Sequence, residues 1–206
     1  MQFKSTIFIA ALTAAAALPA PASAATIATA ITPLNIRSGP GPQYSIVGAI
    51  PGRGRAIVTG CIQGSLWCQV NYNGRQGWAY SQYLTARLAG RSLAVAEAMS
   101  AMPTVIYEAP VETVGTAVPT PVIAGTLIAP PAGPPLSLSP PAAVGSYVVS
   151  HPLAPVYLNG EVVEGVGLPE DVALAPVPGF DYQYAYINNQ PVLVEPQTRR
   201  VEYIYR

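Results

Sequence analysis

Histidine and cysteine are almost missing from this chain, which has one histidine, His151, and two cysteines. A metal site of the histidine and thiolate type needs several such ligands close together, and a serine or cysteine nucleophile needs a base beside it. His151 precedes a proline in a loop-like stretch, and no phosphate-binding loop or zinc signature occurs. We therefore expect a protein that is not an enzyme, with no catalytic residues, no metal ligands and no cofactor.

A site built from carboxylates would need neither histidine nor cysteine. Four acids could form a carboxylate site or could belong to a solvated acidic surface: Glu161, Glu164, Glu170 and Asp171. Glu170 and Asp171 are adjacent and would point to opposite faces of a strand, which makes them a poor acid–base pair. We favour the solvated surface.

Lysine is missing after residue 24, and charges of opposite sign are kept apart. Residues 25–96 contain six arginines and no acid, whereas residues 97–206 contain ten acids and three arginines, so the formal charges are +6 and −7. Three interpretations stay open: the basic stretch binds an anionic component, the two halves attract each other, or the split serves solubility alone. Arginine suits the first because its planar guanidinium binds carboxylates and phosphates in bidentate fashion.

Long hydrophobic runs are missing after the N-terminus, so we expect no transmembrane segment there. Residues 1–24 resemble a secretory signal peptide, with Lys4 as the positive start, an apolar run at 7–18 and Ala-Ser-Ala at 22–24. An uncleaved membrane anchor is the alternative, and the shortness of the apolar run disfavours it. We expect an exported protein, periplasmic or extracellular, in which nucleic acid is a poor partner for the arginines.

Helical periodicity is missing between residues 25 and 88. Short β-rich runs separated by glycine turns occupy this stretch instead: residues 45–50, 56–62, 66–72 and 75–80. The last two are joined by Asn73 and Gly74, a strong hairpin signal because both residues accept positive φ. Strands this short and this closely spaced indicate a barrel or sandwich rather than an α/β fold.

Four motifs follow one another between residues 34 and 84. Residues 34–40 read Leu-Asn-Ile-Arg-Ser-Gly-Pro, Trp67 precedes Val70, residues 77–78 are Gly-Trp, and residues 83–84 are Tyr-Leu. In this order they resemble the bacterial SH3 domain, a small barrel of exported cell-envelope proteins. The resemblance covers about a quarter of the chain, and it implies a barrel that binds cell-wall peptide or a periplasmic protein.

Cys61 and Cys68 flank a turn between two consecutive strands of this barrel. They resemble the paired cysteines of a disulfide-bearing subgroup of the family, and export implies an oxidising compartment. A disulfide here would stabilise the fold by roughly 2–3 kcal/mol in the chain-entropy model. Two free buried thiols are the alternative, and we expect the disulfide.

The candidate binding residues of the barrel are arginines and tyrosines. The arginines that we assign to an anionic envelope component are Arg37, Arg53, Arg55 and Arg75. A tyrosine presents an apolar ring and a polar tip, and the tyrosines that we add are Tyr44, Tyr72, Tyr80 and Tyr83. We assign Trp67 and Trp78 to the core.

Residues 89–145 are expected to form a short helix, at 89–102, followed by a disordered linker with ten prolines between 103 and 145. Residues 146–206 become β-rich again. We expect strands at 147–149, 182–187, 192–194 and 201–205, with a turn at Asn188 and Asn189 that links the second strand to the third. We also expect a hairpin at 156–163 around Asn-Gly.

The run from Tyr182 to Ile204 resembles an uncharacterised domain often attached C-terminally to bacterial SH3 domains. More distantly it resembles the RcnB-type periplasmic domain linked to nickel and cobalt homeostasis, although a single histidine puts nickel binding in doubt. Tyr182, Tyr184 and Tyr186 would share one sheet face. That face is either an aromatic platform for a ligand or part of the core, and we favour the core.

Together these patterns predict a mainly β protein: an SH3-like β-barrel at 25–88, a proline-rich linker and a small C-terminal β-rich domain at 146–206. We expect a non-catalytic exported binding or scaffold protein of the cell envelope. The alternative is a structural or stress-related periplasmic protein whose basic and acidic modules bind each other.

Overall fold

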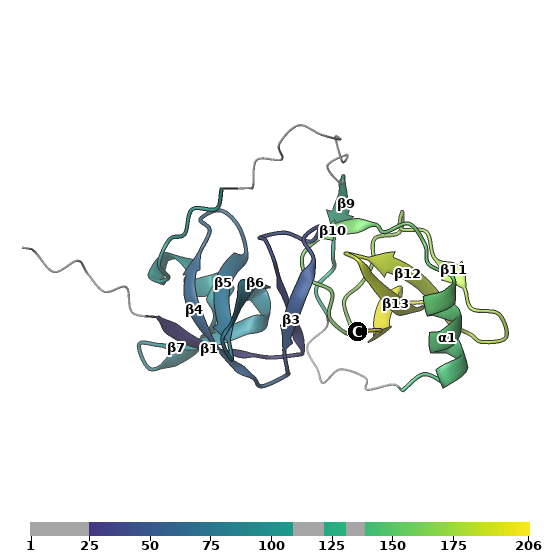
Figure 1. The fold of residues 1–206 in the computed structure, drawn as a ribbon, viewed down its shortest axis with the longest axis horizontal. Helices are drawn as coiled ribbons and strands as arrows, with labels where there is room; N and C mark the ends of the chain where they lie inside the picture. The colour runs from purple at the N-terminus through teal and green to yellow at the C-terminus, as the bar shows by residue number, and fades with distance from the viewer. Residues whose placement is uncertain (1–24, 109–121, 131–138) are drawn as a thin grey trace, which may run out of the picture.

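A computed structural model of the chain describes residues 25–108, 122–130 and 139–206 (Figure 1). The fold is mainly β, as predicted, with an SH3-like sheet from the first half of the chain and a smaller sheet from the second. The expected signal peptide at residues 1–24 lies outside the described residues.

The barrel is one eight-stranded sheet in which every neighbouring pair is antiparallel. Its strands follow the spatial order β3-β2-β6-β5-β4-β1-β7-β8. In chain order they are β1 (Thr26–Ala30), β2 (Leu34–Arg37), β3 (Ile46–Ile50), β4 (Arg55–Cys61), β5 (Trp67–Tyr72), β6 (Arg75–Tyr80), β7 (Leu84–Leu88) and β8 (Arg91–Ala94). A 3₁₀ turn, η1 (Ser81–Tyr83), links β6 to β7. The hairpin predicted at Asn73 and Gly74 is confirmed, with both residues at positive φ.

The barrel core matches its sequence pattern. In β4 inward and outward residues alternate, so that Ala56 and Val58 are buried between exposed neighbours. Trp67 and Trp78 are buried as expected. Cys61 and Cys68 face each other across β4 and β5 and form the predicted disulfide.

The stretch after the barrel differs from the expected helix at 89–102. Ala89 and Gly90 both adopt positive φ, which turns the chain into β8 rather than into a helix. Only a 3₁₀ segment, η2 (Val95–Ala101), follows.

The linker is also more ordered than predicted in the parts that the structure describes. Val105 and Pro103 exchange backbone hydrogen bonds with Cys61 at 3.0 and 2.8 Å, and the Tyr107 ring packs edge-on against Trp78 at 5.4 Å. Further on, β9 (Ile123–Thr126) pairs in parallel with β10 (Tyr157–Asn159). Proline content did not predict this order, because it depends on pairing with distant segments, namely Val105 with Cys61 and β9 with β10.

The C-terminal module is a four-stranded sheet with one helix against it (Figure 1). Its elements are α1 (Ala142–Ser150), β11 (Ala175–Pro176), β12 (Gln183–Ile187), β13 (Gln190–Glu195) and β14 (Arg200–Ile204). The expected strand at 147–149 is wrong, because those residues belong to α1. Val144 and Val148, four residues apart, form the buried stripe of that helix against Tyr184 and Leu193.

The expected hairpin at 156–163 is wrong as well. Tyr157–Asn159 pairs with β9, and residues 160–163 leave the sheet as a buried loop. The predicted tyrosine face contributes to the core, with Tyr184 and Tyr186 on β12 and Tyr182 just before it. Tyr184 is buried, and its hydroxyl donates to the backbone oxygen of His151 at 2.9 Å.

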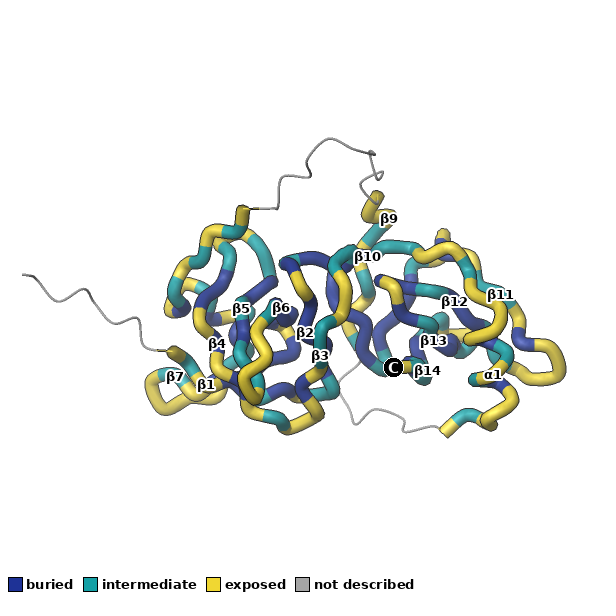
Figure 2. Tube along the Cα trace, in the orientation of Figure 1, coloured by how far each residue is buried: buried dark blue, intermediate teal, exposed yellow. Residues whose placement is uncertain are grey.

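Buried apolar side chains form one continuous cluster that runs from the barrel into the C-terminal module. It includes Ile36 and Leu84 on the barrel side and Leu158, Val162 and Ile187 on the other. Figure 2 shows buried segments on both sides of the junction between the modules. The junction is therefore part of the core.

Candidate functional site

Strand β2 is buried on both faces, which is unusual for a strand of a small barrel. All four of its residues are buried. Because side chains alternate along a strand, Leu34 and Ile36 point into the barrel core, and Asn35 and Arg37 point the other way. Those two polar side chains meet the C-terminal module.

Arg37 makes a bidentate ion pair with Glu161 at this junction. Its Nε donates to Oε2 of Glu161 at 2.5 Å, and its Nη2 donates to Oε1 at 2.7 Å. Its Nη1 donates to the backbone oxygens of Pro42 and Tyr44 at 2.9 and 2.8 Å, and to that of Asn188 at 3.3 Å. Both charged side chains are 0% exposed. A buried ion pair is tolerated only when its hydrogen bonds are satisfied in this way.

Asn35 is the second side chain of the barrel that donates to the Glu161 carboxylate. Its amide nitrogen donates to Oε1 of Glu161 and to Oε1 of Gln190, each at 2.9 Å. The backbone N–H of Val162 donates to the same carboxylate oxygen at 3.1 Å. The carboxylate thus accepts hydrogen bonds from both modules.

Asn188 holds the loop that carries Glu161. It sits at positive φ in the turn between β12 and β13 and is buried. Its side chain accepts from the backbone N–H of Leu158 at 2.8 Å and donates to the backbone oxygens of Leu158 and Gly160 at 3.0 and 3.1 Å. A turn that the Asn-Asn sequence predicted therefore also positions the acid of the junction.

These contacts correct two expectations. Arg37 is not available to an external anion, since its guanidinium is fully buried. Glu161 is not part of a solvated acidic surface, because it neutralises Arg37. The attraction between the two halves was one of the three interpretations of the charge split. The alternation along β2 is the signal that could have separated Arg37 from the other arginines, and no local pattern singles out Glu161.

A surface groove lies on the outer face of the barrel, across β4, β1, β7 and β8, with a volume of about 480 Å³. Two arginines and several hydroxyls line it together with Ile27. The lining side chains that can hydrogen-bond are Arg55, Arg87, Thr26, Thr29, Thr85 and Ser92.

The strand register explains why these residues share one face. Thr29 is paired with Arg55 on one side and with Thr85 on the other. Arg87 is two residues beyond Thr85 on β7, so its side chain projects to the same face. Within the described residues, no carboxylate lies within ion-pair distance of Arg55 or Arg87, so both guanidiniums remain open to a ligand.

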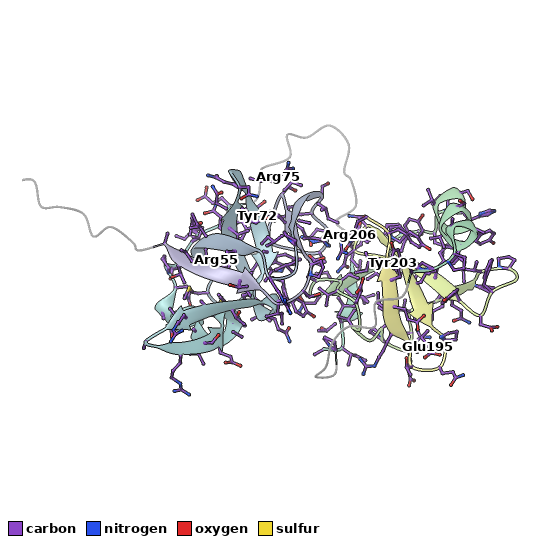
Figure 3. All side chains as sticks on the ribbon, turned by 90° about the horizontal axis from the view of Figure 1, so that it is seen from below. Arg55, Tyr72, Arg75, Glu195, Tyr203 and Arg206 are labelled. Atoms are coloured by element: carbon purple, nitrogen blue, oxygen red, sulfur yellow. A yellow bond between two sulfur atoms is a disulfide. The ribbon has the colours of Figure 1, made fainter. Side chains whose placement is uncertain are left out.

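The other arginines chosen from the sequence do not gather with Arg55. Arg53 is exposed in the turn before β4, at a φ of 66°. Arg75 extends over Gly48, and its guanidinium donates to the backbone oxygen of Val47. Arg55 begins β4 and Arg75 begins β6, two strands away in the sheet, and both are labelled in Figure 3. Sequence reasoning missed Arg87, which only the strand register brings beside Arg55.

The candidate tyrosines also separate. Tyr80 and Tyr83 are each only 5% exposed and belong to the core. Burial raises the pKa of Tyr83, and the neighbouring Tyr80 and the Glu161 carboxylate raise it further. Tyr44 packs edge-on against Tyr107 at 5.9 Å, and Tyr72 is half-buried on β5. None of the four lines the groove.

In the part of the chain that the structure describes, no three histidine, cysteine, aspartate or glutamate side chains come close enough to hold a metal ion. Nor is any helix there long and apolar enough to cross a membrane.

Two family models match the chain, one for each module. Residues 32–85 match the bacterial SH3 domain, and residues 147–206 match a domain of unknown function, DUF1236. The chain therefore carries the combination that its motifs predicted, and neither domain is typical of catalysts. No curated protein and no solved structure matches the chain.

Proposed function

We propose that this chain is an exported, non-catalytic binding protein of the cell envelope, whose bacterial SH3 domain holds a cell-wall peptide in the groove between Arg55 and Arg87. The observation that carries this proposal is the groove itself. It offers two guanidiniums without carboxylate partners, on a barrel whose residues 25–96 contain no acid.

The lining suits a short peptide that bears carboxylates. Each guanidinium can take a carboxylate through two parallel hydrogen bonds. Thr29 and Thr85 line the same groove, and the hydroxyl of Thr29 can bond an amide group of the ligand. The hydroxyl of Thr85 donates to the backbone oxygen of Thr29 at 3.2 Å and can still accept from a ligand N–H. Ile27, about half exposed, offers an apolar surface beside them.

The test is binding of the chain from residue 25 onward to purified sacculi and to a soluble wall peptide. The double change Arg55→Gln and Arg87→Gln removes two charge-assisted contacts and should weaken binding by roughly tenfold or more. Arg91→Gln is the matched control, since Arg91 is exposed on β8 but does not line the groove. Equal binding by the wild type and the double variant would exclude the groove as the binding site.

A second candidate function is favoured by the Arg37–Glu161 pair. In it the chain is a structural periplasmic protein, and the DUF1236 module is the main partner of the barrel. Failure of the wild-type chain to bind wall material at any salt concentration, with the two modules held together, would favour this candidate over the first.

A further inference from the structure

The barrel supplies the two shorter backbone contacts of the Arg37 Nη1 atom, and Asn188 of the C-terminal module adds a longer one at 3.3 Å. The backbone oxygens of Pro42 and Tyr44 hold Nη1. They belong to a loop that closes on itself, since the N–H of Ser38 donates to the oxygen of Ser45 at 2.9 Å. The loop needs glycine at position 39, because a Cβ there would lie 2.4 Å from the Tyr44 ring. Two acceptors of the barrel therefore hold Nη1, and Nε and Nη2 are left for a carboxylate.

The free edge of that guanidinium faces away from the barrel. Its Nε and Nη2, together with the amide of Asn35, form three donors aimed at one carboxylate. Such preorganised donors bind an anion with little loss of side-chain entropy. Asn35 and Arg37 come from one face of one strand, so the set is a property of β2.

Glu161 reaches this edge from a loop and not from a strand of the barrel sheet. The loop residues 160–163 are all buried, yet no strand pairing joins them to the barrel in the described residues. The polar contacts of this loop with the barrel are made by the Glu161 side chain. The loop thus lies on the barrel as a bound acidic peptide would.

We propose that Asn35 and Arg37 form a carboxylate-binding site on the bacterial SH3 domain, and that Glu161 occupies it as an internal ligand. The class of external ligand is an acidic peptide, or any small carboxylate that can reach the site when Glu161 is absent. This site is separate from the Arg55 and Arg87 groove, and it stands or falls independently of the proposed wall binding.

Chemical rescue tests the site in the chain from residue 25 onward. Glu161→Ala removes the atoms of an acetate ion and leaves Cβ in place. Acetate at about 100 mM should then raise the Tm of this variant by about 2–4 °C over chloride at equal ionic strength. Benzoate, which is larger than the deleted group, should not. The wild type and the double variant Arg37→Ala, Glu161→Ala should show no acetate-specific shift.

A second measurement covers the outcome in which Glu161→Ala does not fold. A protease site placed between residues 109 and 121 of the wild-type chain allows the linker to be cut after folding. A peptide of residues 158–165 should then compete with the C-terminal fragment for the barrel, and the same peptide with Glu161→Gln should compete at least tenfold less well. A folded Glu161→Ala chain with equal Tm in acetate and chloride overturns the proposal. So does equal competition by the two peptides.

Discussion

Arg37 and Arg55 lie at the ends of two strands of the same barrel, in a stretch with no acid, and they have opposite surroundings. Arg37, at the end of β2, is fully buried and paired with Glu161. Arg55, at the start of β4, is exposed beside a groove. One guanidinium therefore joins the two modules, and the other is available to a ligand. The difference arises from what covers each strand, which a count of charges does not reveal.

The largest effect should come from breaking the buried pair. Arg37→Ala leaves the Glu161 carboxylate buried without its partner, and we expect a loss of about 3–5 kcal/mol in the free energy of unfolding. Urea unfolding of the chain from residue 25 onward measures this loss. Arg55→Ala serves as the control and should change stability by less than about 0.5 kcal/mol. Equal losses for the two variants would contradict the contrast between the two arginines.

Replacing both members of the pair sharpens the same comparison. The double change Arg37→Met and Glu161→Leu removes both charges and fills the space with apolar side chains. Buried ion pairs exchanged in this way are often neutral or stabilising by roughly 1–4 kcal/mol, so most of the loss caused by Arg37→Ala should return. If the double variant were as unstable as Arg37→Ala alone, shape rather than charge would dominate the junction.

Salt should weaken ligand binding at Arg55 and leave the stability contribution of Arg37 unchanged, and we expect this effect to be smaller than the two above. Exposed charges are screened over about 10 Å at 0.1 M ionic strength, whereas buried pairs are screened much less. Binding at the Arg55 and Arg87 groove should therefore weaken as salt rises from about 50 to about 300 mM. Over the same range, the stability difference between the wild type and Arg37→Ala should stay constant. Salt-independent binding would remove the arginines of the groove from recognition.

Tyr83 offers the smallest and most local test. Burial, Tyr80 and the Glu161 carboxylate all raise its pKa, so the folded state favours the neutral phenol. Unfolded chains release that proton near the ordinary value of 10.0, and stability contributed by the neutral form is lost as pH rises above that value. Glu161→Gln removes one cause and should lower the pKa of Tyr83.

Absorbance of tyrosinate during an alkaline titration follows this change. Arg55→Gln is the control and should leave the titration of Tyr83 at high pH unchanged. A titration curve that Glu161→Gln does not alter would mean that Tyr83 does not sense the carboxylate.

The barrel could be predicted from sequence because its signals are local. The Asn73–Gly74 turn, the short β-rich runs and the ordered motifs each depend on neighbouring residues. The same holds for the turn at Asn188 and Asn189, which was predicted as the link between two strands.

The failures in the C-terminal half have a common physical cause, which is packing between distant segments. Residues 147–149 have strand propensity, but α1 forms because Val144 and Val148 are buried against the sheet. Tyr157–Asn159 pairs with β9 and not with its own neighbours. Glu161 meets Arg37 across 124 residues of sequence. No window of sequence contains both members of such a contact, so the junction had to be seen in the structure.

The 124 residues between Arg37 and Glu161 affect the order in which the molecule folds. Ribosomes release the N-terminal half first, so β2 is complete long before the loop at 160–163 exists. Until then one face of the strand lacks its cover, and the guanidinium of Arg37 stays hydrated. Contacts of long sequence separation form slowly. Docking of Glu161 is therefore expected to be a late event, after the transition state for folding. Mutations at the junction should then accelerate unfolding and leave the folding rate almost unchanged.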